Sequence, residues 1–178
     1  MPQETIRLQD YKTPVGDLIL GVHRDQVVMA DWKYRAQRQK LDERLRKKLN
    51  AVMEFRRAPL HDQIESQLEE YFVGDRKSFD LPLLLLGTDF QNLVWNALLD
   101  IPYGTSESYL SLSRKLNIEK SIRAVASANG ANVISIIIPC HRIIGRDGKL
   151  VGYAGGLPAK KKLLLKEGAL IERQYSLF

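Results

Sequence analysis

The residues with the clearest chemical potential stand together in one tetrapeptide, Pro139-Cys140-His141-Arg142. A thiol is a weak nucleophile until it ionises, and an imidazole beside it can take its proton or stabilise the thiolate. Adjacent residues of a strand point to opposite faces, so adjacency alone does not separate a reactive cysteine from an inert buried one. The context favours a nucleophile, because a glycine-rich loop, Gly152-Tyr153-Ala154-Gly155-Gly156, follows the tetrapeptide.

The elements around the tetrapeptide are predicted from its flanks. Residues 134–138 are rich in β-branched side chains and predict a buried strand that ends at the cysteine. Residues 143–151 predict a hairpin, because glycines at 145 and 148 stand between two short apolar runs. A last helix is expected over about residues 158–167.

Upstream, three helices are expected in the C-terminal half. Thr88 or Asp89 can cap a helix whose apolar residues recur at helical spacing up to Leu98. Two short helices over about 107–116 and 119–129 are joined by a polar turn, which suggests a helix-turn-helix. The second of these is rich in small residues, which permits either close approach to another surface or tight packing between helices.

The N-terminal half has a different pattern. Residues 5–32 predict short strands of an antiparallel meander, residues 33–57 a helical or partly loop segment, and residues 61–72 a helix that stops at Gly74. A proline-containing extended connector follows, and the domain boundary is placed near residue 85. The sequence therefore predicts an α/β domain over 1–85, with a small antiparallel sheet, and a mostly α-helical domain over 86–178.

Composition limits the function classes. The chain has 178 residues and a net charge of +6, of which +5 lies in residues 86–178. This basic excess suggests attraction to a polyanion, although a solvated surface explains it equally well. With one cysteine and three histidines at no metal-ligand spacing, we expect no metal and no other cofactor. The apolar runs are too short for a membrane span and no signal pattern is present, so a cytoplasmic location without membrane contact is expected.

Several motifs together carry a family resemblance. They are Gly87-Thr88-Asp89-Phe90-Gln91 with Val94-Trp95, Ile101-Pro102-Tyr103-Gly104, Ser108-Tyr109, Arg123-Ala124-Val125, Ile138-Pro139-Cys140-His141-Arg142 and Gly152-Tyr153-Ala154-Gly155-Gly156. In this combination the chain resembles the O6-alkylguanine-DNA alkyltransferases, most densely over residues 81–168. The resemblance implies a ribonuclease H-like N-terminal domain and a winged-helix-like C-terminal domain.

The resemblance also implies a chemistry for five residues. Cys140 would accept the alkyl group from the O6 atom of guanine irreversibly, so that each molecule acts once. His141 would be the base, acting through a water, and Glu167 would orient it. Asn132 would brace the active-site turn, and Tyr109 would assist rotation of the nucleotide and donate a proton to the leaving guanine.

The partner implied by the resemblance is double-stranded DNA containing O6-alkylguanine, bound in the minor groove without sequence preference by a monomer. Arg123 would fill the space that the extruded base leaves. The residues expected to contact DNA are Ser108, Arg123, Ala124, Ser127 and Arg142, and those expected to form the substrate pocket are Tyr153, Ala154, Gly155 and Lys160.

Two other functions compete with this prediction. A non-catalytic alkyltransferase-like protein would only mark damaged DNA, but such proteins replace the cysteine that is present here at position 140. A cysteine hydrolase would use Cys140, His141 and Glu167, and would release its product and leave the thiol free.

Overall fold

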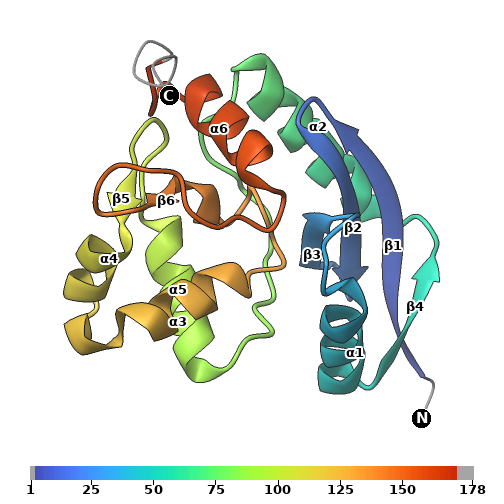
Figure 1. Ribbon diagram of the computed structural model, residues 1–178. Coiled ribbons are helices and arrows are strands. Elements are labelled where there is room, and N and C mark those ends of the chain that lie inside the picture. Colours follow the sequence, from blue (N-terminus) through green and yellow to red (C-terminus); the bar gives the residue numbers. More distant parts are fainter. Residues whose placement is uncertain (1–2, 172–178) are drawn as a thin grey trace. The chain divides into compact units, whose positions relative to one another are not determined.

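The computed structural model of the protein describes residues 3–171. The chain forms two compact units, which we describe separately (Figure 1). The first contains the chain up to Leu86 together with Val133–Ile137, and the second contains Gly87–Asn132 and the chain from Ile138 onward. The segment Val133–Ile137 therefore groups with the N-terminal part of the chain, although its position in the sequence places it in the predicted C-terminal domain.

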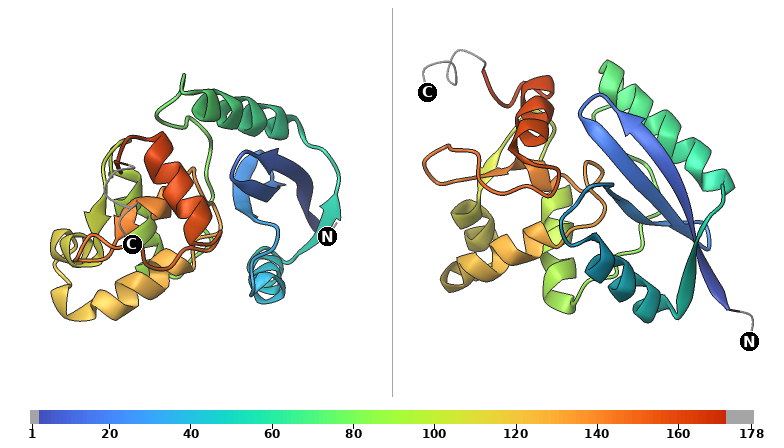
Figure 2. Two further views of the ribbon diagram at one scale, coloured as in Figure 1. Left: turned by 45° about the horizontal axis from the view of Figure 1, so that its top comes forward. Right: turned by 45° about the vertical axis from the view of Figure 1, so that its right-hand side comes forward.

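The first unit contains a four-stranded sheet in the order β3-β2-β1-β4 (Figure 1 and Figure 2). Its strands are β1 (Glu4–Thr13), β2 (Gly16–His23), β3 (Gln26–Trp32) and β4 (Ala51–Phe55). The first three are antiparallel neighbours, as expected, but β4 pairs with β1 in parallel. The sheet is therefore mixed, and the prediction of an antiparallel sheet was wrong in this respect.

Two helices pack on this sheet. Helix α1 (Arg38–Leu49) contacts β4, and α2 (Pro59–Val73) contacts β1 and β2. Helix α1 buries Leu41 and Leu45 and ends at Asn50, whose left-handed backbone turns the chain directly into β4. Helix α2 ends at Gly74 with a φ of 96°, a conformation that favours glycine and that agrees with the predicted stop.

The second unit is mainly helical. Its elements are α3 (Asp89–Leu99), β5 (Glu107–Ser108), α4 (Tyr109–Lys115), η1 (Glu119–Ser121), α5 (Ile122–Gly130), η2 (Cys140–Arg142), β6 (Ile143–Ile144) and α6 (Leu157–Lys166). Thr88 caps α3 as predicted, since its hydroxyl accepts a hydrogen bond from the Gln91 amide at 3.2 Å. The Trp95 indole joins α3 to α5 by donating to the Ala128 carbonyl at 2.7 Å.

Two strand predictions near the cysteine were wrong. Residues 134–138 form no continuous strand, because Ile136 has a φ of 71° and the segment makes isolated bridges, among them that of Ile134 to Ala30 of β3. Residues 143–151 form no hairpin, because Ile143 and Ile144 pair in parallel with Glu107 and Ser108. Both segments take partners that are distant in sequence.

The architecture is thus a mixed α/β unit followed by a mainly helical one. The finer ribonuclease H-like and winged-helix-like assignments stay predictions. In the part of the chain described, residues 3–171, no helix is both long and apolar enough to cross a membrane.

Candidate active site

Cys140 begins a tight turn instead of ending a strand. Pro139 has φ −80° and ψ 58°, the geometry of an inverse γ-turn, and the Cys140 amide donates to the Ile138 carbonyl at 2.8 Å. The Arg142 amide then donates to the Pro139 carbonyl at 3.0 Å and closes the 3-10 turn η2. The fixed φ of proline thereby sets the position from which the cysteine side chain starts.

Asn132 braces this turn from the preceding loop. Its side-chain amide donates to the Ile138 carbonyl at 3.1 Å and lies 3.2 Å from the Sγ atom of Cys140. Asn132 is 1% exposed, so these bonds form away from competing water. An N–H donor aimed at sulfur stabilises a thiolate, and the residue therefore both fixes the turn and favours the nucleophilic form.

Among the described residues, the His141 ring makes a hydrogen bond through only one of its two nitrogens. Its Nε2 atom lies 2.7 Å from a carboxylate oxygen of Glu167, which follows α6, and neither side chain is exposed. A carboxylate only accepts, so Nε2 carries the hydrogen of the neutral ring and Nδ1 carries the lone pair. Among the described residues Nδ1 has no hydrogen-bond partner. This arrangement leaves a basic nitrogen ready to take a proton.

Arg142 shares the same carboxylate. Its guanidinium donates to Glu167 at 2.8 Å and 3.1 Å and to the Ile101 carbonyl at 2.6 Å, and the residue is 6% exposed. The expectation that Arg142 contacts DNA does not fit this position, because the side chain is buried and its donors are used inside the unit. Arg142 instead holds Glu167 in place for His141.

Burial and pairing set the protonation states. Burial lowers the pKa of His141 below its usual value, and this effect outweighs the hydrogen bond and the charge of Glu167, which raise that pKa. Burial alone would raise the pKa of Glu167, but hydrogen bonds from His141 and Arg142 outweigh it and bring that pKa to about 2. At neutral pH the site therefore contains a neutral imidazole beside a carboxylate.

Cys140 opens into a pocket of about 280 Å³. This volume is just below the range of about 300–1,000 Å³ in which drug-sized ligands bind, so it suits a smaller group. The pocket is lined by Tyr109, Ala126, Asn129, Gly130, Cys140, Gly152, Tyr153 and Ala154. Two residues of the predicted pocket, Tyr153 and Ala154, thus lie at it, whereas Gly155 and Lys160 are not among the lining residues.

Tyr109 keeps its hydroxyl proton at neutral pH. Burial, and then the nearby Cys140, raise the pKa of Tyr109 above its usual value of 10. The residue starts α4 directly after Ser108, whose hydroxyl accepts from the Ser111 amide at 3.0 Å. Ser108 has a capping role that sequence reasoning did not assign, and it fixes the start of the helix that brings Tyr109 to the pocket.

Lys160 supports the glycine-rich loop from beneath. Its ammonium donates to the carbonyls of Ile143, Val151 and Gly152, and the residue is fully buried. Lys160 does not itself line the pocket, but it donates to the carbonyl of Gly152, which does, so its place in the substrate pocket stays a prediction. It ties the start of the loop that carries Tyr153 to the strand that follows the cysteine turn.

Helix α5 separates its two faces by residue type. Val125, Ala128 and Asn129 are buried, whereas the predicted DNA-contacting residues Arg123, Ala124 and Ser127 are exposed. An exposed helix face with small side chains and one arginine permits close approach to another surface.

Sequence reasoning missed two polar residues of the site. The Asn129 amide reaches the Cys140 carbonyl at 3.5 Å, and the ring of Tyr103 lies 5.7 Å from the Arg142 guanidinium carbon. Asn129 was detectable as a polar residue at the i+4 position from Val125, on the buried face of α5. Tyr103 belongs to the Ile101-Pro102-Tyr103-Gly104 motif of the family resemblance, but nothing in that motif indicates its contact with Arg142.

The fold and site define a class of protein. It has a buried thiol braced by an amide, a neutral imidazole backed by a carboxylate, a small pocket and an exposed helix with small side chains. Among residues 3–171 no three His, Cys, Asp or Glu side chains gather in a way that could hold a metal. The buried thiol, the imidazole–carboxylate pair and the small pocket together are typical of a cysteine nucleophile that acts on a small group.

Comparisons with known proteins agree with this class. Residues 89–169 match the family described as "6-O-methylguanine DNA methyltransferase, DNA binding domain". The chain is 38% identical to the constitutive methylated-DNA–protein-cysteine methyltransferase of Bacillus subtilis, over 86% of this chain and 90% of that one. It is 52% identical to the methyltransferase of that name from Methanosarcina acetivorans, over 58% of this chain and 66% of that one.

A solved structure is similar over nearly the whole length. The crystal structure of Mycobacterium tuberculosis OGT in complex with DNA is matched with a TM-score of 0.76 and 36% identity, over 93% of both chains. Together these matches show that the chain belongs to the methylated-DNA–protein-cysteine methyltransferase family.

Proposed function

We propose that this protein repairs DNA by transferring the alkyl group of O6-alkylguanine to the sulfur of Cys140, once per molecule. The main observation behind this proposal is that the one cysteine of the chain lines a small pocket and that the Asn132 amide lies 3.2 Å from its sulfur. The next residue, His141, is paired with Glu167. The family membership and the DNA complex of a relative support duplex DNA as the partner.

Cys140, His141 and Tyr109 account for the proton transfers and for the bonds made and broken in the proposed reaction. Nδ1 of His141 takes the thiol proton through a water, and the sulfur attacks the alkyl carbon in line with the bond to O6. The new S–C bond forms as the C–O6 bond breaks, and its electron pair leaves with the guanine. Tyr109 then donates a proton to the guanine and recovers one from His141, so the thiol proton ends on the repaired base.

The alkylated base must leave the duplex to meet Cys140. Extrusion costs a few kcal/mol, and Arg123 on the exposed face of α5 would occupy the vacated space. The small side chains of Ala124 and Ser127 would let the helix approach the minor groove, and contacts to phosphate would give no sequence preference. Action as a cytoplasmic monomer stays a prediction from the sequence.

The test is intact mass after incubation with an oligonucleotide that contains O6-methylguanine. We expect a gain of one methyl group per chain, saturating at one, with no gain on undamaged DNA or in Cys140→Ala. The matched control is Ser113→Ala, another buried small side chain of the second unit, which should gain the methyl group normally. Binding without any mass gain would instead identify a damage-marking protein, and repeated turnover with a free thiol would identify a hydrolase.

A further inference from the structure

The strongest concentration of charge in the chain lies outside the site. Residues 33–48, which we call the basic segment, contain eight basic and two acidic residues, a net charge of +6 that equals the charge of the whole chain. The rest of residues 1–85 carries a net charge of −5, so the near-neutral total of the N-terminal half hides this segment. It comprises the loop after β3 and nearly all of α1.

Part of this charge has a structural role. Arg35 and Arg38 pair with Asp31, which is fully buried on β3, at 2.9 Å and 3.4 Å. Arg38 also pairs with Asp42 one turn further along α1, at 2.8 Å. These arginines fix the beginning of the helix against the sheet, and they leave two of the nearby carboxylates already neutralised.

Three other cations of the segment have no such role. Lys40, Arg46 and Lys47 are exposed, and their side chains make no ion pair or hydrogen bond with any residue of the described chain. Lys40 and Lys47 are seven residues apart and therefore lie on one face of α1, about 10 Å from each other. The packing of the helix relies on Leu41 and Leu45, so it does not require these charges.

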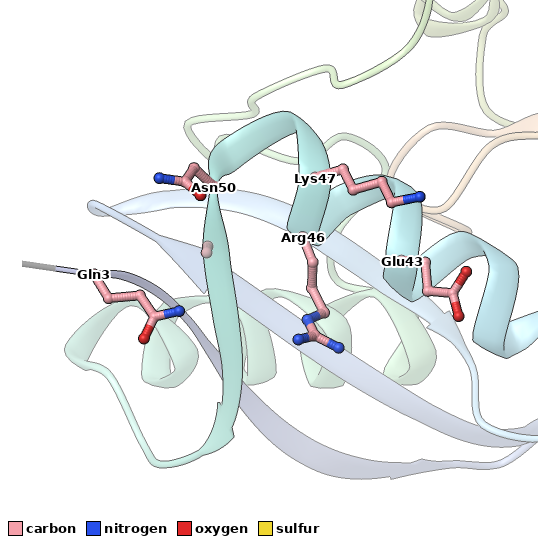
Figure 3. Close-up of a pocket in the computed structure, with 6 residues that line it drawn as sticks. Gln3, Glu43, Arg46, Lys47 and Asn50 are labelled. Carbon is pink, nitrogen blue, oxygen red and sulfur yellow. The ribbon is translucent and has the colours of Figure 1, made fainter.

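Arg46 and Lys47 also border a hollow of about 310 Å³ at the end of α1, together with Gln3, Asn50 and Ala51. Figure 3 shows the two cationic side chains leaving the helix in different directions. One carboxylate, Glu43, is among the lining residues, and it accepts a hydrogen bond from Gln39 at 3.4 Å. The hollow therefore presents two cations, one carboxylate and two side-chain amides, which leaves a net charge of +1.

The segment also exposes an aromatic hydroxyl. Tyr34 is 82% exposed and stands between Lys33 and Arg35 in the loop before α1. Tyrosine, lysine and arginine side chains are among the groups that bind phosphate oxygens of DNA.

Helix electrostatics alone do not account for this pattern. Cations in the last turn interact favourably with the helix dipole, by about 0.3–1 kcal/mol each, which covers Arg46 and Lys47 but not Lys40. Burial, and then the charge of Arg35, lower the pKa of the Arg44 guanidinium, so that Arg44 and Arg35 repel each other within this segment. An anionic partner would relieve that repulsion.

We propose that the basic segment is a second DNA-binding surface, which holds the phosphate backbone of a duplex independently of the Cys140 pocket. Its chemistry identifies a polyanion, and the choice of duplex DNA rests on the proposed function. The loop with Tyr34 and the α1 cations Lys40, Arg46 and Lys47 would contact successive phosphates and add affinity without sequence preference.

The test compares two triple variants of the full chain with equal loss of charge. The first is Lys40→Gln/Arg46→Gln/Lys47→Gln, and the control is Lys12→Gln/Arg56→Gln/Lys77→Gln, three exposed cations elsewhere in the first unit. Binding to an undamaged duplex of about three helical turns is followed by fluorescence anisotropy at increasing salt. Each phosphate contact contributes about 0.9 to the slope of log K against log salt, so the first variant should flatten it by about 2.7.

Each result of the binding comparison either supports or overturns the proposal that the basic segment binds DNA. A flatter slope and weaker binding in the first variant, with the control close to the parent protein, support it. An equal change in both variants, or none in the first, overturns it. Loss of binding to vesicles containing phosphatidylserine, with DNA binding intact, also overturns it and assigns the surface to anionic membranes.

Two further measurements distinguish a failure of the basic-segment proposal from a failure of the methyl-transfer proposal. The rate of methyl transfer from the free O6-methylguanine base should be equal in both triple variants and the parent, which verifies that the pocket is intact. If the parent transfers no methyl group at all, the repair proposal fails, while the binding comparison on undamaged DNA still tests the basic segment.

Discussion

Glu167 serves two buried partners, and this sharing determines the acid–base state of the site. The carboxylate pairs with Arg142 through two hydrogen bonds and with His141 through a third. Without Arg142, the charge of Glu167 would act on His141 alone and would favour the protonated ring, which is no base. Burial first, and then the charge of Arg142, lower the pKa of His141 and keep the imidazole neutral while the carboxylate orients it.

This arrangement predicts a loss of stability in acid. The pKa of Glu167 is about 2 in the folded protein against 4.5 for the free side chain, a difference of about 3 kcal/mol. A lowered carboxyl pKa contributes stability that is complete above pH 4.5 and is lost as the pH falls toward 2. Urea denaturation at a series of pH values should show this loss in the parent protein.

The matched variant is Glu167→Gln, which has no carboxyl group to titrate there. It should be less stable at pH 7, because Arg142 is left buried without its partner, and its stability should fall less over the same acid range. Equal slopes in the two proteins would contradict the assignment of the effect to Glu167.

Asn132 gives a second prediction at the scale of one residue. Asn132→Ala removes the donor that faces the Cys140 sulfur and the bond to the Ile138 carbonyl. We expect slower alkylation of the thiol by iodoacetamide, by about tenfold, because one hydrogen bond to a charged group is worth about 1.5–3 kcal/mol. Since the chain has one cysteine, the mass gain reports this site alone.

Asn96→Ala is the control for this prediction. Its side-chain amide also donates to a backbone carbonyl, that of Asn92, but on the exposed side of α3. It should leave the alkylation rate unchanged. An unchanged rate in Asn132→Ala as well would show that the asparagine does not activate the thiol.

Among the elements, the loop after β6 depends on one lysine. Lys160 on α6 donates to three carbonyls of this region, and burial lowers the pKa of its ammonium to about 8. In Lys160→Met the carbonyls lose their donor while the volume of the side chain is nearly kept, at an expected cost of about 1–3 kcal/mol. The loop should then be cut faster by a protease, and methyl transfer should be slower.

The neighbouring Lys161→Met and Lys162→Met variants are the controls. Both remove a lysine from the same helix without removing the donor to these carbonyls. They should keep the protease resistance and the transfer rate of the parent protein. A similar loss in all three variants would show that the charge of α6, not the support of the loop, is responsible.

The elements also show where sequence patterns determine structure. Helices with continuous apolar spacing and a cap, such as α3 after Thr88, were predicted closely, because the relevant contacts lie within the helix. Strand β4 was missed because Val52 and Phe55 continue the helical spacing of α1, and only the left-handed Asn50 breaks it. The isoleucine-rich segment before Cys140 was misassigned because its residues are buried and bridge to β3 only at isolated positions, without forming a continuous strand.

The site residues also divide into those that the sequence predicted and those whose contacts arise only in the folded chain. Cys140, His141 and Glu167 were predicted from the family resemblance, and the structure pairs His141 with Glu167, while the catalytic roles of the three stay predictions. Arg142 was misplaced, and the three carbonyl contacts of Lys160 were not predicted, because a sequence does not show whether a cation faces solvent or donates to buried acceptors. That distinction depends on Glu167 and on loop carbonyls that approach only in the folded chain.

At the scale of the whole molecule, the chain crosses between its two units more than once. Val133–Ile137 leaves the helical unit, pairs with β3 of the first unit and returns to form the cysteine turn. The Ala30 amide donates to the Val133 carbonyl at 2.9 Å, and the Ser135 amide donates to the Ala30 carbonyl at 2.8 Å. The segment that leads directly into the active site is therefore stabilised by the N-terminal part of the chain.

This connection predicts that residues 87–178 will not form a stable active protein alone. Without β3, the backbone of this segment loses its partner and four buried side chains, those of Val133, Ile134, Ile136 and Ile137, lose their cover. At about 1.5–3 kcal/mol for each buried apolar side chain, the loss is comparable to the whole stability of a small domain. Circular dichroism during urea denaturation should show a low midpoint or no cooperative transition, and coexpression with residues 1–86 should restore methyl transfer. A fragment that unfolds cooperatively near the midpoint of the full chain would show instead that the helical unit holds the cysteine turn unaided.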